Sequence, residues 1–171
     1  MLTMPGISTP IPHKVTHQIY IIKGGQEQMA ETKYGKYIIT ELKPGLAVPE
    51  FRVEPPDFMT HLLWTGDGVI KGCPHMECVW IWKRSASSGP AAHTHDFDEI
   101  LGFIGTDPEN IQDLGGDLEI WLEDEKHVIN KSCLIYVPKG MKHCPLRTTR
   151  LDRPIFHFFF ATAGAYSGDV K

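Results

Sequence analysis

Helical periodicity is almost absent from this chain, and its absence limits the possible folds more than any other feature does. Short runs of β-branched and aromatic residues recur instead, separated by glycine, proline, aspartate and asparagine. Only Gln26–Thr32 and Pro108–Leu114 have even a brief helical pattern. We predict about ten strands, namely His17–Lys23, Lys36–Leu42, Met59–Trp64, Val79–Arg84, Ala92–His95, Glu99–Ile104, Leu118–Glu123, His127–Ile129, Cys133–Val137 and Pro154–Ala161. Short strands at this spacing predict an all-β fold, either a sandwich or a barrel that closes its own edges.

Glycine and proline divide the chain into three predicted parts. Turns such as Gly66–Gly68 and Pro138–Gly140 supply the backbone angles that a strand reversal needs. The stretch Pro44–Pro56 contains four prolines, which is too many for a central strand and typical of an extended arm. We therefore expect N-terminal strands and a proline-rich arm over residues 1–56, a β-barrel over 57–165 and a tail over 166–171.

Length and charge exclude several classes of protein. A chain of 171 residues with 42% hydrophobic residues can bury one real core. The net charge of −4 argues against nucleic-acid binding, which needs a basic field. There is no apolar run of the ~20 residues that a membrane helix needs, and the first residues do not resemble a secretory signal. We expect a cytoplasmic protein without nucleic-acid or membrane partners.

The cysteines have neither zinc-ribbon nor redox spacing. Cys73 and Cys78 are separated by four residues, and Cys133 and Cys144 stand apart from them. In a chain without an export signal, the expectation is free and mostly buried thiols.

Two segments are rich in aromatic side chains. Both alternating faces of Ile155–Phe160 are large and apolar, which predicts a strand buried on both sides. Val79–Trp82 has the same character. Core filling is the favoured interpretation, and the lining of a pocket for an apolar or aromatic ligand is the alternative.

The segment Gly89–Glu99 contains the residues that point to chemistry. Side chains two positions apart on a strand share one face, so His93 and His95 can point inward together while Thr94 points away. Glu99 follows four residues later, after a short turn. Two imidazoles and a carboxylate that meet at one interior point suit a divalent transition metal. Without such a partner, their burial would be costly.

A second segment, Val137–His143, complements the first. Pro138 and Gly140 predict a tight turn that leads into a strand, and His143 begins that strand. A neighbouring strand could bring His143 to the same point as a third imidazole. Four protein ligands leave about two of six octahedral positions open, which suits water, substrate or dioxygen and favours a catalytic over a structural site.

The order H-x-H-x3-E, followed about forty residues later by P-x-G-x2-H, resembles the two motifs of the cupin superfamily. The resemblance covers Val79 to Phe160. It implies an antiparallel jelly-roll barrel, or double-stranded β-helix, with one metal ion near its centre. It also assigns the four metal-ligand positions to His93, His95, Glu99 and His143.

Some framework positions depart from the cupin pattern. Ser87 and Ser132 stand where a glycine commonly opens each motif, and Gly89 can serve the first. Gly105 comes one residue early, and Arg147 stands where an asparagine often ends the second motif. These departures predict altered turns, while the ligand set is intact.

The other histidines are interpreted more simply. Surface or satisfied core positions are expected for His13, His17, His61, His75 and His127. His157 is expected in the core, with a cavity-facing position as the alternative. The further candidates for a role beside the metal are His157, Arg147, Tyr136, Asp98 and Trp82.

These patterns predict a metal-dependent cupin-type enzyme that acts on a small oxygenated organic molecule. The aromatic interior favours a dioxygenase, with iron as the favoured ion and manganese, nickel or zinc also compatible with the ligands. An isomerase, decarboxylase or lyase is the near alternative, although it needs a general acid or base that the sequence does not identify. A non-catalytic module that binds a small ligand is the alternative from another class. A homodimer is expected, since twofold symmetry is the commonest among soluble proteins.

Overall fold

A computed structural model describes residues 20–23, 26–29, 33–44, 58–85 and 89–163. The chain forms two compact units, Met1–Ile38 and Ile39–Lys171. The boundary that we predicted after residue 56 lies outside the described residues. None of the described residues belongs to a helix that is long and apolar enough to cross a membrane.

The described residues of the first unit form two short strands and one helical turn. Strands β1 (Tyr20–Lys23) and β2 (Gln26–Met29) pair antiparallel, and η1 (Gly35–Tyr37) is a 3-10 turn. The helical interpretation of Gln26–Thr32 is therefore wrong for its first four residues, which are a strand; the rest lie outside the described residues. The predicted strand Lys36–Leu42 is also wrong, because its residues form the end of η1 and irregular backbone.

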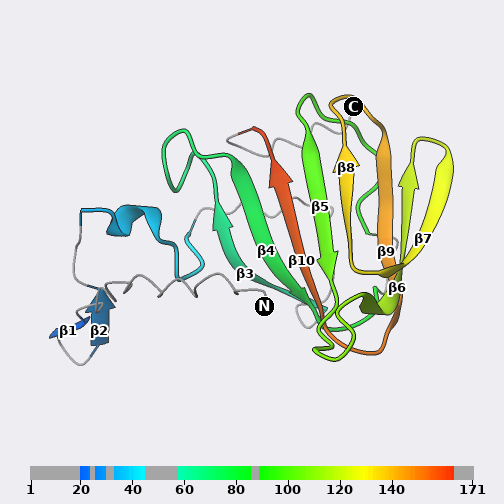
Figure 1. Cartoon of the computed structure of the whole chain (residues 1–171). Helices are drawn as coiled ribbons and strands as arrows, with labels where there is room; N and C mark the ends of the chain where they lie inside the picture. The colour runs from blue at the N-terminus through cyan, green and yellow to red at the C-terminus, as the bar shows by residue number, and fades with distance from the viewer. Residues whose placement is uncertain (1–19, 24–25, 30–32, 45–57, 86–88, 164–171) are drawn as a thin grey trace, which may run out of the picture. The chain divides into compact units, whose positions relative to one another are not determined.

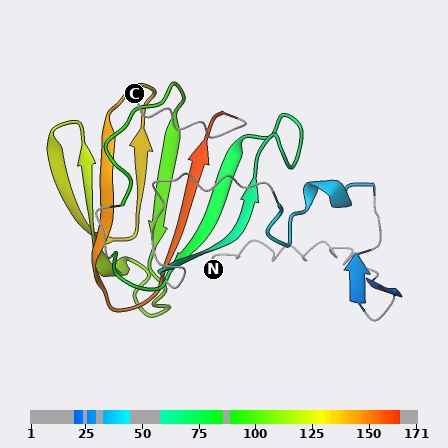
Figure 2. The same cartoon turned by 180° about the vertical axis from the view of Figure 1, so that it is seen from behind.

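In the second unit, the described residues form two antiparallel sheets (Figures 1 and 2). The larger sheet has the order β3-β4-β10-β5-β8, and the smaller has the order β7-β6-β9. The bounds are β3 Met59–Thr65, β4 His75–Ile81, β5 Glu99–Ile104, β6 Asp113–Leu122, β7 Glu125–Lys131, β8 Cys133–Val137, β9 His143–Leu151 and β10 Ile155–Ala161.

The order in which the chain visits the two sheets defines a jelly roll. After β4 the chain crosses to the smaller sheet, where His93 forms a single antiparallel bridge with His143 of β9. It then returns to the larger sheet as β5, crosses for β6 and β7, and alternates through β8, β9 and β10. Long crossings between two antiparallel sheets are the Greek-key connections of that fold. The prediction of an all-β, cupin-like jelly roll is confirmed.

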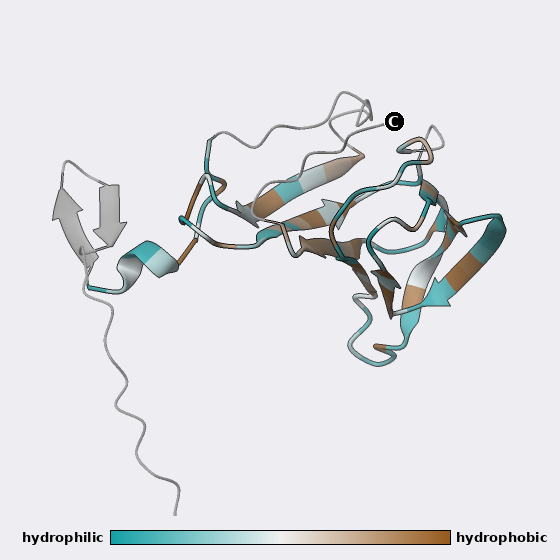
Figure 3. Cartoon of the chain, turned by 90° about the horizontal axis from the view of Figure 1, so that it is seen from above, coloured by the Kyte–Doolittle hydropathy of each residue, from teal (hydrophilic) through white to brown (hydrophobic). Residues whose placement is uncertain are grey.

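Side chains from both sheets meet in one core. It includes Phe103 and Ile155 from the larger sheet and Leu118 and Ile120 from the smaller one, each at most 1% exposed. Figure 3 shows the alternating hydropathy along the strands. The predicted burial of both faces of Ile155–Phe160 is wrong, since burial alternates along β10 and its outward side chains are only half-buried.

Several boundaries also differ from the predictions. Ala92–His95 is not a strand but the single bridge at His93. Pro108–Leu114 is not helical, because it forms turns that lead into β6. The Gly115–Gly116 pair lies within β6, where the register with β7 shifts between Asp113 and Leu118. This irregularity interrupts the alternation from which the start of a strand is predicted.

Candidate metal centre

Two distant segments bring the predicted ligands together. Glu99 is the first residue of β5, and His143 is the first residue of β9. The backbone N–H of His93 donates to the carbonyl oxygen of His143, and the N–H of His143 donates to the carbonyl oxygen of His93. The N···O distance is 3.0 Å in both hydrogen bonds. The N–H of Gly140 in the second turn also donates to the carbonyl oxygen of His95 at 2.9 Å. The backbone therefore fixes the spacing of the two motifs.

The side chains of the four residues are all buried, with His93, His95, Glu99 and His143 between 2% and 7% exposed. Glu99 Oε2 lies 3.2 Å from His95 Nε2 and 3.3 Å from His143 Nε2. The ligand atoms of these three residues lie within 4.8 Å of one another. The ring of His93 lies beside that of His143, at 4.3 Å between centroids, and 6.1 Å from that of His95.

Each imidazole has a defined tautomer. The Nδ1 atom faces a backbone carbonyl oxygen, which can only accept a hydrogen bond, so Nδ1 must donate. The pairs are His93 with Ala91 at 2.8 Å, His95 with Phe97 at 2.7 Å and His143 with Met141 at 3.1 Å. In a neutral ring, the lone pair is therefore on Nε2. Metal-binding histidines are commonly oriented in this way by a second hydrogen bond.

The arrangement of lone pairs calls for a positive charge between these groups. Unprotonated Nε2 atoms of His95 and His143 would face a carboxylate oxygen that also carries only lone pairs. A proton or a cation removes this repulsion. With metal–ligand bonds of ~2.1 Å, neighbouring ligands of an octahedral ion lie roughly 3 Å apart, close to the observed contacts. The residues present fit a divalent transition metal ion.

The pKa shifts agree with this description. Burial raises the pKa of Glu99, but its contacts with His143 and His95 outweigh burial and lower it to about 2. Burial lowers the pKa of His95, but the contact with Glu99 outweighs it, and the net change is upward. Burial lowers the pKa of His93, which favours the neutral form that binds metals.

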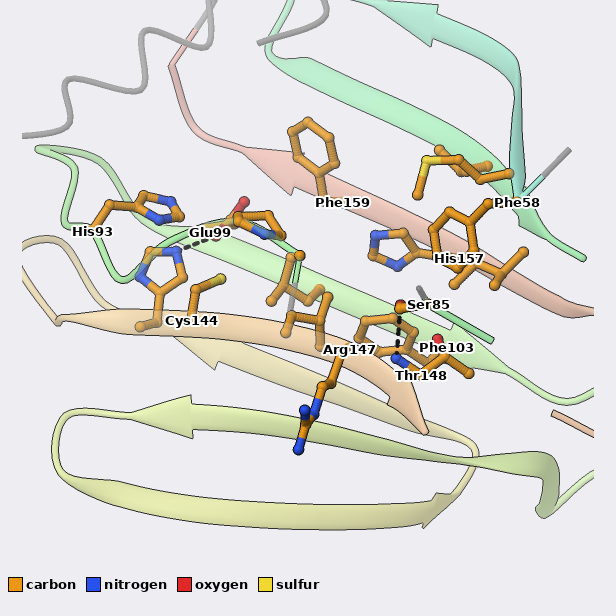
Figure 4. A pocket seen from close by; sticks show the side chains of 18 residues that line it. Phe58, Ser85, His93, Glu99, Phe103, Cys144, Arg147, Thr148, His157 and Phe159 are labelled. Atoms are coloured by element: carbon orange, nitrogen blue, oxygen red, sulfur yellow. Dashed lines mark hydrogen bonds and ion pairs between the residues drawn. The ribbon is translucent and has the colours of Figure 1, made fainter. Parts of the chain in front are cut away.

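A small cavity adjoins these ligands, with a volume of about 100 Å³ (Figure 4). Glu99, His93 and His143 form one end, and His157 with Ser85 and Thr148 forms the other. Apolar side chains make up most of the walls between the two ends. The wall residues are Phe58, Met59, Val79, Ile81, Gly89, Pro90, Leu101, Phe103, Cys144, Leu146, Arg147 and Phe159.

His157 has the cavity-facing position that was the alternative in the sequence analysis. It is 8% exposed, and its ring stacks on Phe103 at 4.3 Å between centroids. Its Nδ1 donates to the carbonyl oxygen of Gly102 at 2.9 Å, so Nε2 carries the lone pair of the neutral ring. His157 is thus the imidazole at the end of the cavity away from Glu99.

The other candidate residues lie elsewhere. Arg147 lines the cavity with its stem, but its guanidinium pairs with Glu119 at 2.6 Å and points away from the cavity in Figure 4. Tyr136 is 58% exposed and Trp82 is 44% exposed, and neither lines the cavity. Asp98 accepts a hydrogen bond from the N–H of Lys139 at 2.9 Å, which ties the first motif to the second turn.

Two features were missed in the sequence analysis. Cys144 is buried at the cavity wall, where its sulfur lies within 4.8 Å of ligand atoms of His93 and His143. Glu77 is buried between two imidazoles, 2.9 Å from His61 Nε2 and 3.0 Å from His75 Nε2. His61 and His75 thus have the hydrogen-bonded positions that the sequence analysis expected for them. Their spacing in the sequence did not predict that Glu77 is the shared partner.

No family model and no curated sequence matches the chain. Among solved structures, oxalate oxidase in complex with glycolate matches at 11% identity and a TM-score of 0.44, covering 66% of this chain and 55% of that one. KdgF from Halomonas sp. matches at 17% identity and a TM-score of 0.37, covering 60% of this chain and 76% of that one. An RmlC-like cupin from Shewanella frigidimarina matches at 11% identity and a TM-score of 0.40, covering 72% of this chain and 95% of that one. The chain thus spans about half of the first of these structures.

The topology and the ligand arrangement define the class: a jelly-roll protein with a candidate mononuclear metal centre beside a mainly apolar cavity. Within that class, the order of the two motifs is the one that cupins have.

Proposed function

We propose that this protein is a cupin-type, metal-dependent enzyme that acts on a small oxygenated organic molecule. The observation that carries the proposal is the fixed tautomer of three buried imidazoles beside Glu99. The backbone presents their Nε2 lone pairs before any ion arrives, which is the preorganisation that a metal site requires. His93, His95, Glu99 and His143 would hold the ion. Such an ion polarises a substrate oxygen as a Lewis acid and, if it is iron, also supports oxidation by dioxygen.

The size of the cavity limits the substrate. The cavity has a volume of about 100 Å³. An apolar cavity that holds one benzene ring has a volume of about 150 Å³. The cavity therefore favours a molecule of a few carbon and oxygen atoms over an aromatic substrate. One oxygenated end would lie at the metal ligands, and the apolar walls would exclude water from the rest.

His157 favours a second reaction class besides oxygenation. As a neutral imidazole with its lone pair on Nε2, it can accept a proton from a substrate held in the cavity. The stacking on Phe103 and the hydrogen bond to Gly102 hold the ring in place. A base opposite a Lewis acid is the arrangement that an isomerase, decarboxylase or lyase needs. The iron-dependent dioxygenase would thus require dioxygen, whereas the proton-transfer enzyme would require His157 and no dioxygen.

The test is a substrate screen with small hydroxy and keto acids, aldehydes and sugar acids. The protein is prepared metal-free and then loaded with Fe²⁺, Mn²⁺, Ni²⁺ or Zn²⁺, with and without air. We expect a substrate to be consumed only by loaded protein. A requirement for air identifies the dioxygenase, and activity without air that falls at least about a hundredfold in His157→Phe identifies the proton-transfer enzyme.

The matched control is His127→Phe, because this histidine is on β7 and does not line the cavity. It should leave every rate unchanged. Saturable binding of a small acid without any product, under both atmospheres and with every ion, would contradict the proposal and favour the ligand-binding module.

A further inference from the structure

Strand β9 begins with a break in its regular alternation. His143 and Cys144 are consecutive, so in a regular strand their side chains would point to opposite faces. Both are buried, and both line the same cavity. The pairing with β6 shows the reason, since Leu122 pairs with His143 and Ile120 with Leu146, a shift of register between the two pairs. A bulge of this kind re-aims side chains.

The backbone of Cys144 supports the same conclusion. Its φ is +72°, in the left-handed region that non-glycine residues seldom adopt. Such a conformation is unfavourable for a residue with a side chain and is commonly retained where function requires it. Here it turns the thiol toward the interior, as Figure 4 shows.

The thiol meets two imidazoles there. The sulfur of Cys144 and ligand nitrogens of His93 and His143 lie within 4.8 Å of one another. The hydrogen bonds of Nδ1 leave the lone pairs of both histidines on Nε2. This group of three shares His143 with the group of His95, Glu99 and His143.

We propose that Cys144 supplies a sulfur ligand to the ion that His93 and His143 hold. The inference rests on the proposed metal centre and goes beyond its three histidines and glutamate. Binding replaces the S–H bond with a metal–sulfur bond, and the thiol proton leaves to solvent. No change of oxidation state is involved. A thiolate ligand favours ions that accept sulfur, such as Zn²⁺ and Co²⁺, over Mn²⁺, which prefers oxygen.

The experiment uses Co²⁺ as a spectroscopic probe of the full chain. Coordination by sulfur gives an intense charge-transfer band in the near ultraviolet, whereas coordination by nitrogen and oxygen gives only weak visible bands. We expect the intense band in the wild type and its loss in Cys144→Ser. The matched control is Cys78→Ser on β4, whose residue is half-buried and outside the cavity, and it should retain the band.

A second variant keeps the test decisive if Cys144→Ser does not fold. A chain with Cys73→Ser, Cys78→Ser and Cys133→Ser retains only Cys144, and its Co²⁺ complex should show the full band. In binding titrations, Cys144→Ser should lower the affinity for Zn²⁺ at least about tenfold and leave that for Mn²⁺ within about twofold.

Two failures are distinguishable. Stoichiometric Co²⁺ without the intense band in the wild type would overturn the sulfur ligand and leave the proposed enzyme intact. Failure of the wild type to bind Co²⁺, Zn²⁺ or Mn²⁺ would overturn both.

Discussion

At the scale of single residues, three backbone carbonyl groups determine what the histidines can do. Because the oxygens of Ala91, Phe97 and Met141 accept from Nδ1, each ring offers its other nitrogen to the interior. The same arrangement recurs at His157, whose Nδ1 donates to Gly102. A set of otherwise unrelated hydrogen bonds thus assigns the chemical role of every cavity-lining imidazole.

The charges of the centre predict a pH dependence of stability for the metal-free protein. The pKa of Glu99 is lowered from its ordinary 4.5 to about 2, so its stabilising contribution is present above pH 4.5 and is lost as the pH falls toward 2. The pKa of His95 is raised from 6.5, so its contribution is present below pH 6.5 and is lost as the pH rises through the raised value. We therefore expect the free energy of unfolding to fall on the acidic side as Glu99 gains a proton, and the His95 contribution to disappear as the pH rises through its raised pKa.

Urea denaturation across pH 2.5–8.5 measures this profile. Glu99→Gln should lose most of the decline on the acidic side, which we expect to be roughly 3 kcal/mol in the metal-free wild type. An unchanged acidic decline in Glu99→Gln would show that other carboxyl groups cause it.

The sequence was sufficient to predict that His93, His95, Glu99 and His143 lie near one another, although the strand Ala92–His95 on which part of that prediction rested is only a bridge at His93. It was not sufficient for Cys144. Regular alternation directs the residue after His143 to the opposite face, and the bulge that reverses this depends on pairing with β6. Long-range register of this kind is not encoded in the local pattern.

At the scale of elements, the loop before His93 depends on close backbone contact. Gly89 has a φ of +66°, and a Cβ atom added there would overlap the carbonyl oxygen of Leu146 on β9. Gly72 has a similar φ of +77° but has open space around it. A substitution of Gly72 therefore measures the cost of a left-handed backbone alone. The same substitution of Gly89 adds the cost of a steric clash.

We expect Gly72→Ala to destabilise the protein by about 1 kcal/mol and Gly89→Ala by about 2–4 kcal/mol. Gly89→Ala should also weaken metal binding, because the displaced loop carries His93. Chemical denaturation and a zinc titration of both variants check this. Equal effects of the two substitutions would show that Leu146 does not restrict the loop.

The prediction of individual strands succeeded where each strand has one buried face. Glu99–Ile104 and Cys133–Val137 have the predicted bounds. Lys36–Leu42 failed because its apolar residues are exposed, with Tyr37 at 58% and Leu42 at 48%, and no partner strand pairs with them in the described part of the chain. Composition alone cannot distinguish such a segment from a strand, because strand formation depends on the partner.

At the scale of the whole molecule, the larger sheet presents exposed apolar side chains on its outward face. Leu134 is 66% exposed, Tyr136 58% and Trp82 44%. Leu134 and Tyr136 are on β8, whereas Trp82 follows β4, and two strands lie between β4 and β8, so these side chains do not by themselves mark an interface. The expected homodimer stays a prediction.

Sedimentation equilibrium tests the dimer directly. We expect a particle of twice the chain mass of 19.3 kDa and a shift to the single chain in Leu134→Glu. The control is Val128→Glu on β7 of the smaller sheet, which is 63% exposed and should leave the mass unchanged. A wild type that sediments only as a single chain would contradict the dimer.

The central claim is that one ion binds at the point where His95, Glu99 and His143 converge. The most direct measurement is the metal content of the purified protein by elemental analysis, for the wild type, His95→Ala and the control His127→Ala, with circular dichroism to confirm that each is folded. We predict one transition-metal ion per chain in the wild type and in His127→Ala, and a loss of at least about tenfold in His95→Ala. Full occupancy of a folded His95→Ala protein, or a wild type that carries and takes up no transition metal, would contradict this account.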